Sequence, residues 1–161
     1  MSLSGLIART PSPPLRVASV RVSRQLSASP GRIFDAWLNP YEARSFLFAR
    51  RMGDAVSSEI DARVGGRFRI VRHRDGEDVE YSGEYLEIER PHRLVFSLFV
   101  EKYAQSDDRV IVELAPVVNQ ALLVLTHELS VPDPAARWRI QHEWATVLDR
   151  LGRALYPWGI D

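Results

Sequence analysis

The sequence contains no cysteine among its 161 residues. This absence excludes disulfide bonds, a thiolate nucleophile and a zinc site built from thiolates, and it is compatible with a reducing compartment. Lysine is almost as scarce, because Lys102 is the only one and nearly every positive charge is a guanidinium.

Net charge and long apolar runs are also lacking. The 21 basic and 21 acidic residues cancel, so no overall field attracts a polyanion and the sequence predicts no nucleic-acid partner. No apolar run approaches the roughly 18 residues that cross a bilayer, so no membrane segment is predicted. Hydrophobic residues make up 45% and charged residues 26%, which is typical of a globular protein, and we expect a cytoplasmic one.

The length of the chain suits a single domain. We predict a flexible leader over residues 1–16, which is rich in proline and serine, and one folded domain over residues 17–161. Arginines interspersed with serines near the N-terminus also fit an organelle transit peptide. The leader interpretation is favoured because residues 17–26 already have the pattern of a folded strand.

The first elements follow from alternation and capping signals. Residues 17–26 alternate apolar and polar side chains, which predicts a strand with one buried face. Ser29-Pro30 combines a hydroxyl N-cap with a proline at the first helical position, and a short helix is expected after it. Asn39-Pro40 ends that helix, and residues 41–48 are expected to form a second one.

The middle of the chain has the pattern of an antiparallel meander, in which brief alternating segments are separated by turn residues. Asp75-Gly76 is the strongest hairpin signal, because both residues tolerate positive φ. With the first strand, we expect a sheet of six or seven strands. The segments predicted as strands in this part are residues 60–64, 68–72, 79–88, 93–100, 110–114 and 122–129.

The last element is a long amphipathic helix. Asp133-Pro134 repeats the cap and proline signal, and Pro157 ends the pattern. Such a helix is roughly 33 Å long, enough to lie along the whole sheet. The apolar residues at helical spacing are Ile140, Trp144, Val147, Leu148, Leu151 and Leu155. The fold class is therefore α+β, with a curved antiparallel sheet around the C-terminal helix and two short helices after the first strand.

Specific motifs occur in this order of elements, in residues 22–30, 33–40, 60–68, 81–85, 91–96, 123–127 and 144–155. Their sequences resemble the family similar to activators of the ninety-kilodalton heat-shock protein ATPase, which belongs to the START-like or SRPBCC superfamily. The resemblance spans roughly residues 17–156 and implies that residues 17–161 form a START-like ligand-binding domain, with a helix-grip fold and a ligand cavity between sheet and helix, without fixing the ligand. The chain departs from the family pattern at Phe46, Ala121 and Glu143.

Strand alternation predicts which side chains meet the long helix. Among the polar ones, His127 is either a general base or ligand-orienting group, or a core histidine with a hydrogen-bonded neighbour. Arg72 either pairs with a ligand carboxylate at the cavity mouth or forms a salt bridge. The predicted cavity-lining residues are Trp37, Phe46, Phe68, Ile70, Arg72, Tyr81, Tyr85, Phe96, Leu98, Val112, Leu114, Leu123, Leu125, His127, Trp144 and Leu148.

No catalytic constellation is found in the sequence. The G-x-S-x-G, H-E-x-x-H and phosphate-binding glycine motifs are all missing, and the catalytic residues stay unassigned. The acidic cluster at residues 75–80 is expected to be a solvated turn rather than a cation site. The sequence therefore predicts neither a metal nor a cofactor.

Three functions remain open. The leading hypothesis is non-enzymatic binding of an apolar small molecule in the cavity, with no nucleic-acid or membrane partner and with a homodimer as a further hypothesis. The second is an enzyme of the aromatase or polyketide-cyclase type, in which Tyr81, Tyr85 or His127 polarises a carbonyl group. The third is a co-chaperone or protein-interaction module, as the name of the family suggests.

Overall fold

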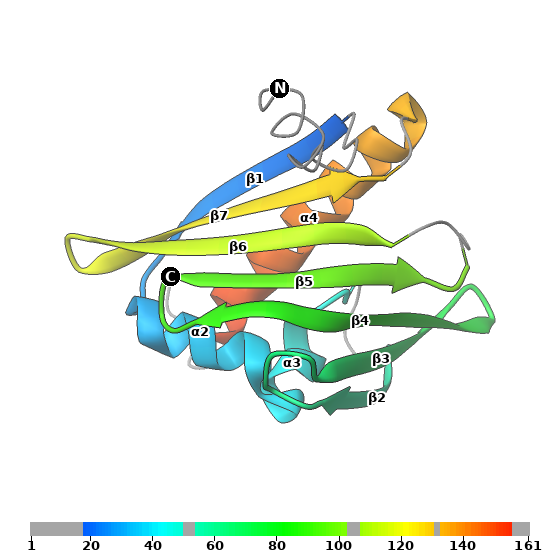
Figure 1. The fold of residues 1–161 in the computed structure, drawn as a ribbon, viewed down its shortest axis with the longest axis horizontal. Coiled ribbons are helices and arrows are strands. Elements are labelled where there is room, and N and C mark those ends of the chain that lie inside the picture. The colour runs from blue at the N-terminus through cyan, green and yellow to red at the C-terminus, as the bar shows by residue number, and fades with distance from the viewer. Residues whose placement is uncertain (1–17, 50–53, 103–106, 131–132, 156–161) are drawn as a thin grey trace, which may run out of the picture.

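The computed structural model describes residues 18–49, 54–102, 107–130 and 133–155, and the predicted leader lies outside them. The described residues form one sheet and three helices (Figure 1). The elements are β1 (Ala18–Leu26), α2 (Pro30–Leu38), α3 (Pro40–Phe46), β2 (Ala55–Ile60), β3 (Arg67–Arg74), β4 (Glu77–Glu89), β5 (Arg93–Val100), β6 (Asp108–Val117), β7 (Gln120–Leu129) and α4 (Pro134–Ala154).

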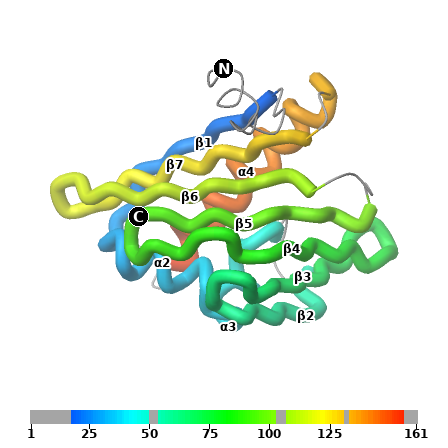
Figure 2. Tube along the Cα trace, viewed as in Figure 1, coloured from blue at the N-terminus to red at the C-terminus, as the bar shows by residue number. Residues whose placement is uncertain are grey.

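The sheet has seven strands in the order β1-β7-β6-β5-β4-β3-β2, and all neighbouring strands are antiparallel. Strands β2 to β7 follow one another as a meander, while β1 pairs with the last strand and places Ala18 opposite Leu129. Figure 2 shows this N-terminal strand running beside β7 along the edge of the sheet. The predicted α+β helix-grip fold is confirmed.

Helix α4 lies across one face of the sheet, where the sequence predicts it (Figure 1). The Asp133 side chain accepts a hydrogen bond from the Ala135 amide at 3.1 Å, and Pro134 occupies the first helical position. These two features satisfy a free amide at the helix start and preset its backbone angle. The buried stripe of the helix consists of Ala136, Ile140, Trp144, Val147, Leu148 and Leu151.

The short helices α2 and α3 form an elbow on the same side of the sheet as α4. Ser29 caps α2 by accepting from the Arg32 amide at 3.1 Å, and Asn39 caps α3 by accepting from two amides at its start. Each helix has a proline at its first position. The elbow directs Trp37 and Phe46 into the core, where both are almost completely buried.

The position of β2 differs from the prediction. The sequence favours a strand at residues 60–64, whereas β2 spans Ala55–Ile60 and residues 61–66 form the turn before β3. Val64, the last residue of the predicted strand, is 60% exposed. β2 is the edge strand beside β3 in the described sheet, and most of its side chains are only partly buried. A strand of this kind does not need alternating apolar residues, and the prediction depends on that alternation.

Candidate functional site

A cavity of about 440 Å³ lies between the sheet and the N-terminal half of α4. Its strand-borne residues gather at one end of the sheet, because Tyr81 pairs with Val100 and Leu98 pairs with Asp108 across neighbouring strands. Exposed residues of α4 also line it, so the cavity reaches the surface. The lining residues are Phe48, Ala49, Arg74, Tyr81, Leu98, Val100, Asp108, His127, Trp138, Arg139, Ile140, His142, Glu143, Trp144, Thr146 and Val147.

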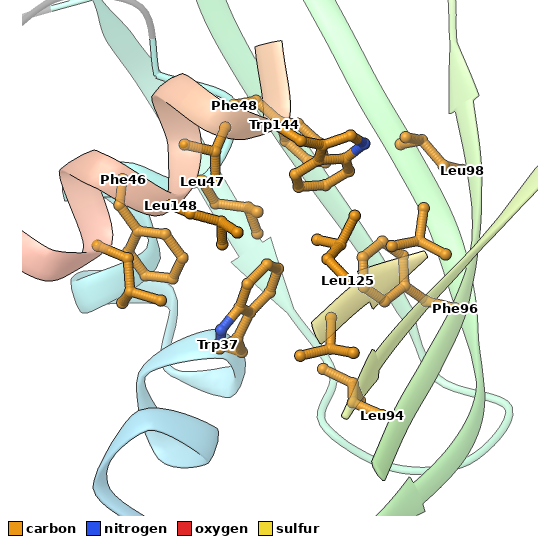
Figure 3. Packing of buried hydrophobic residues seen from close by; sticks show 14 of the residues in the cluster. Trp37, Phe46, Leu47, Phe48, Leu94, Phe96, Leu98, Leu125, Trp144 and Leu148 are labelled. Atoms are coloured by element: carbon orange, nitrogen blue, oxygen red, sulfur yellow. The ribbon is translucent and has the colours of Figure 1, made fainter. Parts of the chain in front are cut away.

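The other end of the space beneath α4 is filled by side chains. The Trp37 ring packs edge-on against Phe46, with 5.3 Å between ring centroids, and Phe96 packs edge-on against Phe68 at 5.4 Å. Figure 3 shows the rings of Trp37, Phe46 and Phe96 in the layer between the helices and the strands. A void of about 10 Å³ remains there, which is no larger than the space that one water molecule needs. This end is a solid core.

The structure divides the predicted cavity residues between these two regions. Every one of them is buried. Tyr81, Leu98, His127 and Trp144 line the large cavity. The remaining predicted residues lie outside its lining: Trp37, Phe46, Phe68, Ile70, Arg72, Tyr85, Phe96, Val112, Leu114, Leu123, Leu125 and Leu148.

Trp144 forms the partition between the two regions. Its ring centroid lies 6.3 Å from that of Trp37 on the packed side and 5.5 Å from that of Phe48, which lines the cavity. In Figure 3 its indole nitrogen points toward the strands, and this N–H donates to His127 Nδ1 at 2.8 Å. The ring is therefore held by packing on its face and by a hydrogen bond at its edge.

That hydrogen bond continues into a buried chain of polar groups. His127 Nε2 lies 2.8 Å from Asp108 Oδ2, and the Ser130 amide and hydroxyl donate to Asp108 Oδ1 at 2.9 and 3.0 Å. An indole N–H can only donate, so His127 Nδ1 must accept and the ring proton lies on Nε2. Neutral His127 thus donates to the carboxylate of Asp108.

The acidity of Asp108 reflects these contacts. Burial alone raises the pKa of its carboxyl group, but hydrogen bonds from His127 and Ser130 stabilise the charged form and leave the pKa below its ordinary value. Asp108 is therefore ionised at neutral pH and fixes the tautomer of His127. The chain Ser130, Asp108, His127 and Trp144 holds β6, β7 and α4 together at the cavity wall.

This arrangement limits what the polar wall does chemically. Both ring nitrogens of His127 are engaged, so the ring removes a proton from a ligand only after one of these bonds breaks. Tyr85 lies beside the small void of the packed end, and burial, followed by the nearby Asp61 charge, raises its pKa far above the ordinary value. Neither residue is placed as a ready acid or base, whereas the Tyr81 ring is part of the cavity wall.

Arg72 is a structural residue in this fold. It is 1% exposed and its Nη1 lies 3.0 Å from Asp54 Oδ1, while other guanidinium nitrogens donate to the carbonyls of Leu47 and Ala43. The guanidinium thereby satisfies backbone carbonyls at the end of α3. Of the two interpretations, the salt bridge is correct, and the position at a cavity mouth is wrong because Arg72 points beneath α3.

The arginine that lines the cavity is Arg74, two residues further along the same face of β3. Its side chain is 7% exposed, its Nη2 donates to the Phe48 carbonyl, and its guanidinium carbon lies 5.2 Å from the centroid of the Tyr81 ring. Phe48 has a φ of 59° and stacks on Tyr81 at 4.4 Å with an interplanar angle of 5°. Arg74, Phe48 and Tyr81 form one wall of the cavity.

Several lining residues were missed by the sequence analysis. Arg74 has the same inward parity as Arg72, so the alternation of β3 contains the signal for it. Phe48 follows α3 in a left-handed backbone conformation that no sequence pattern indicates. The α4 residues Trp138, His142 and Thr146 form a second stripe beside the buried one, and they look like ordinary solvent-facing positions in the sequence.

In the ranges that the structure covers, no helix is both long and apolar enough to cross a membrane. No group of three or more histidine or acidic side chains is arranged to hold a metal ion within those same ranges.

Comparisons with solved structures agree with this fold. A Chromobacterium violaceum protein is 26% identical, with a TM-score of 0.70 over 83% of this chain and 94% of its own. A Rhodobacter sphaeroides protein is 22% identical, with a TM-score of 0.73 over 91% and 97% of the two chains. DynU16, from the dynemicin biosynthetic locus, is 16% identical, with a TM-score of 0.71 over 86% of this chain and 47% of its own.

No curated protein matches the sequence significantly. The family described as activator of Hsp90 ATPase homolog 1-like protein matches residues 27–156, which include every element from α2 to α4. This chain therefore belongs to the activator of Hsp90 ATPase homolog 1-like family, within the START-like or SRPBCC superfamily.

Proposed function

We propose that the protein binds an apolar small molecule in the cavity beside α4. The observation that carries this proposal is a space of about 440 Å³ that Phe48, Tyr81, Leu98, Val100 and Trp144 help to line. Small-molecule sites commonly have volumes of about 300–1,000 Å³ and mainly apolar walls with a few polar groups. An apolar ligand restores the dispersion contacts that these side chains lack across an open space.

The rigidity of the walls supports binding. Trp144 is held by two aromatic neighbours and by its bond to His127, and the Phe48 ring is stacked on Tyr81. Side chains that are already fixed lose little conformational freedom when a ligand arrives. The favourable free energy of each new contact is therefore offset by only a small loss of conformational entropy.

The polar groups of the cavity favour binding over turnover. His127 and Asp108 satisfy each other and hold β6 and β7 against α4. A general base needs a free lone pair directed at the substrate, and neither nitrogen of His127 offers one in this arrangement. We therefore put a binding protein ahead of a cyclase-type enzyme.

A fluorescence titration tests the proposal. The probe is 1-aminoanthracene, a neutral aromatic molecule whose emission rises in apolar surroundings. We expect saturable binding by the wild-type chain and at least a tenfold weaker affinity in Val100→Phe, which places a larger side chain in the cavity. The matched control is Val117→Phe on β6, because Val117 is 37% exposed and does not line the cavity.

The outcomes separate the three hypotheses. Failure of the wild-type chain to take up the probe, or equal affinity in Val100→Phe, contradicts the proposed function. Conversion of a bound polyketone, lost in His127→Phe with the fold intact, indicates an enzyme instead. Stimulation of the chaperone ATPase by a chain that takes up no probe supports the interaction module that the family name suggests.

A further inference from the structure

Arg74 brings a buried positive charge to the wall of the cavity. Its side chain is 7% exposed, and in the part of the chain that the structure describes no carboxylate lies within 4.0 Å of it. Its Nε is buried and has no hydrogen-bond partner among the described residues. The contacts that it does make are with the Phe48 carbonyl and the face of the Tyr81 ring, and neither of these groups neutralises the charge.

The neighbouring Arg72 shows what a paired arginine looks like in the same strand. It has an ionised partner, Asp54, whose side chain is 4% exposed, in addition to its carbonyl acceptors. The charge of Arg74 also lies close enough to lower the pKa of Arg72, although burial is the larger cause. Arg72 therefore has a carboxylate partner in Asp54, whereas Arg74, on the cavity wall, forms no ion pair with a described residue.

Two carboxylates, those of Asp108 and Glu143, line the cavity together with Arg74. The Asp108 oxygens accept from His127 and Ser130, Glu143 has another partner, and within the described residues neither carboxylate forms an ion pair with Arg74. An unpaired buried charge is costly, and a partner that brings a carboxylate into the cavity recovers this cost.

We propose that the ligand is an apolar carboxylic acid whose carboxylate pairs with Arg74 while its hydrocarbon part lies against Phe48, Tyr81 and Trp144. This inference rests on the proposed function and adds the charge of the ligand to it. A guanidinium binds a planar carboxylate through parallel N–H donors and stays charged at all physiological pH values. The aromatic wall beside it has the flat shape that suits a ring or a conjugated chain.

A matched pair of probes tests this charge preference without any mutation. 2-Naphthoate and 2-naphthamide have nearly the same shape, but only the first is an anion. Hydrogen bonds to charged groups contribute about 1.5–3 kcal/mol, so calorimetry is expected to give a naphthoate affinity roughly 10 to 150 times that of naphthamide. Equal affinities for the two probes overturn the inference and leave the proposed function intact, whereas binding of neither probe contradicts the proposed function itself.

Two variants then locate the charge that is responsible. Arg74→Met removes the guanidinium group and keeps an unbranched apolar side chain, and we expect it to abolish the preference for naphthoate over naphthamide. Arg139→Met, at another cavity-lining arginine on α4, is the matched control and should keep the preference. A preference that survives in Arg74→Met but disappears in Arg139→Met places the carboxylate elsewhere and overturns the assignment. Circular dichroism shows whether each variant is folded, and the wild-type comparison remains decisive if Arg74→Met is not.

Discussion

Replacement of Asp108 by asparagine tests whether the polar chain at the cavity wall holds β6, β7 and α4 together. The two oxygens of Asp108 accept from His127 and from Ser130. Asparagine offers one oxygen and one NH₂ group, so a donor must face either Ser130 or His127. If it faces His127, the ring must move its proton to Nδ1, where it meets the N–H of Trp144.

Every orientation of the amide therefore leaves a buried donor without an acceptor. Hydrogen bonds to charged groups contribute about 1.5–3 kcal/mol, and an unsatisfied buried donor costs about 1–3 kcal/mol. Asp108 has an exposed side-chain fraction of 16% and His127 of 4%, so solvent compensates only a small part. We expect Asp108→Asn to lower the free energy of unfolding at pH 7 by about 2–3 kcal/mol.

The effect should also depend on pH. The folded-state pKa of Asp108 lies below its ordinary value of 3.8, so its charged form stabilises the fold above pH 3.8 and this contribution disappears as the pH falls through the lower folded value. The difference between wild type and Asp108→Asn is then constant near neutral pH and shrinks in acid. Urea unfolding followed by tryptophan fluorescence and circular dichroism, from pH 7 down to pH 3, measures it.

Asp35→Asn is the control, because Asp35 forms an exposed ion pair with Arg90 and exposed pairs contribute little to stability. Two results would refute the reasoning. One is an Asp108→Asn variant as stable as wild type at pH 7. The other is a stability difference that does not diminish in acid.

Three further substitutions follow from the same structure. Arg72→Met removes the buried ion pair with Asp54, and urea unfolding should show a free energy of unfolding lower by about 3–5 kcal/mol; a loss below 1 kcal/mol contradicts the salt-bridge interpretation. Gly83→Ala places a methyl group against the Ser97 carbonyl oxygen of the neighbouring strand, and thermal denaturation should show a destabilisation of about 1–3 kcal/mol. Gly152→Ala has room in α4, since the nearest other atom is 3.5 Å away, and should raise stability by about 0.5–1 kcal/mol; an unstable variant would show that α4 packs more tightly than described.

Much of the fold could be predicted because its signals are local. The cap and proline pairs that start α2 and α4 lie within two residues of each other, and alternation in β3, β5 and β7 assigns each side chain to a face without knowledge of the partner strand. The β2 strand was misplaced because it is an edge strand with little buried surface. Its position is determined by pairing with β3, which is a long-range interaction.

The site was predicted less well, because a cavity is a property of the assembly. Alternation indicates that Phe68, Phe96 and His127 all point toward α4, but it does not tell which of them other side chains cover. Phe68 and Phe96 pack against each other, whereas His127 borders open space. The same parity thus gives a core residue at one end of the sheet and a cavity residue at the other.

The position of the elbow explains this difference between the two ends. Trp37 of α2 and Phe46 of α3 enter the space beneath α4 at the end where Leu148 and Leu151 face the sheet, and their bulk fills it. Toward the start of α4, α3 has already ended, and Phe48 and Ala49, which follow α3, line the space there. Figure 1 shows α2 and α3 near one end of the sheet and α4 running obliquely behind its strands, and the described residues that line the cavity include none from α2 or α3. The cavity should therefore persist when residues on its walls change, and it should close only when a larger side chain enters it, as in Val100→Phe.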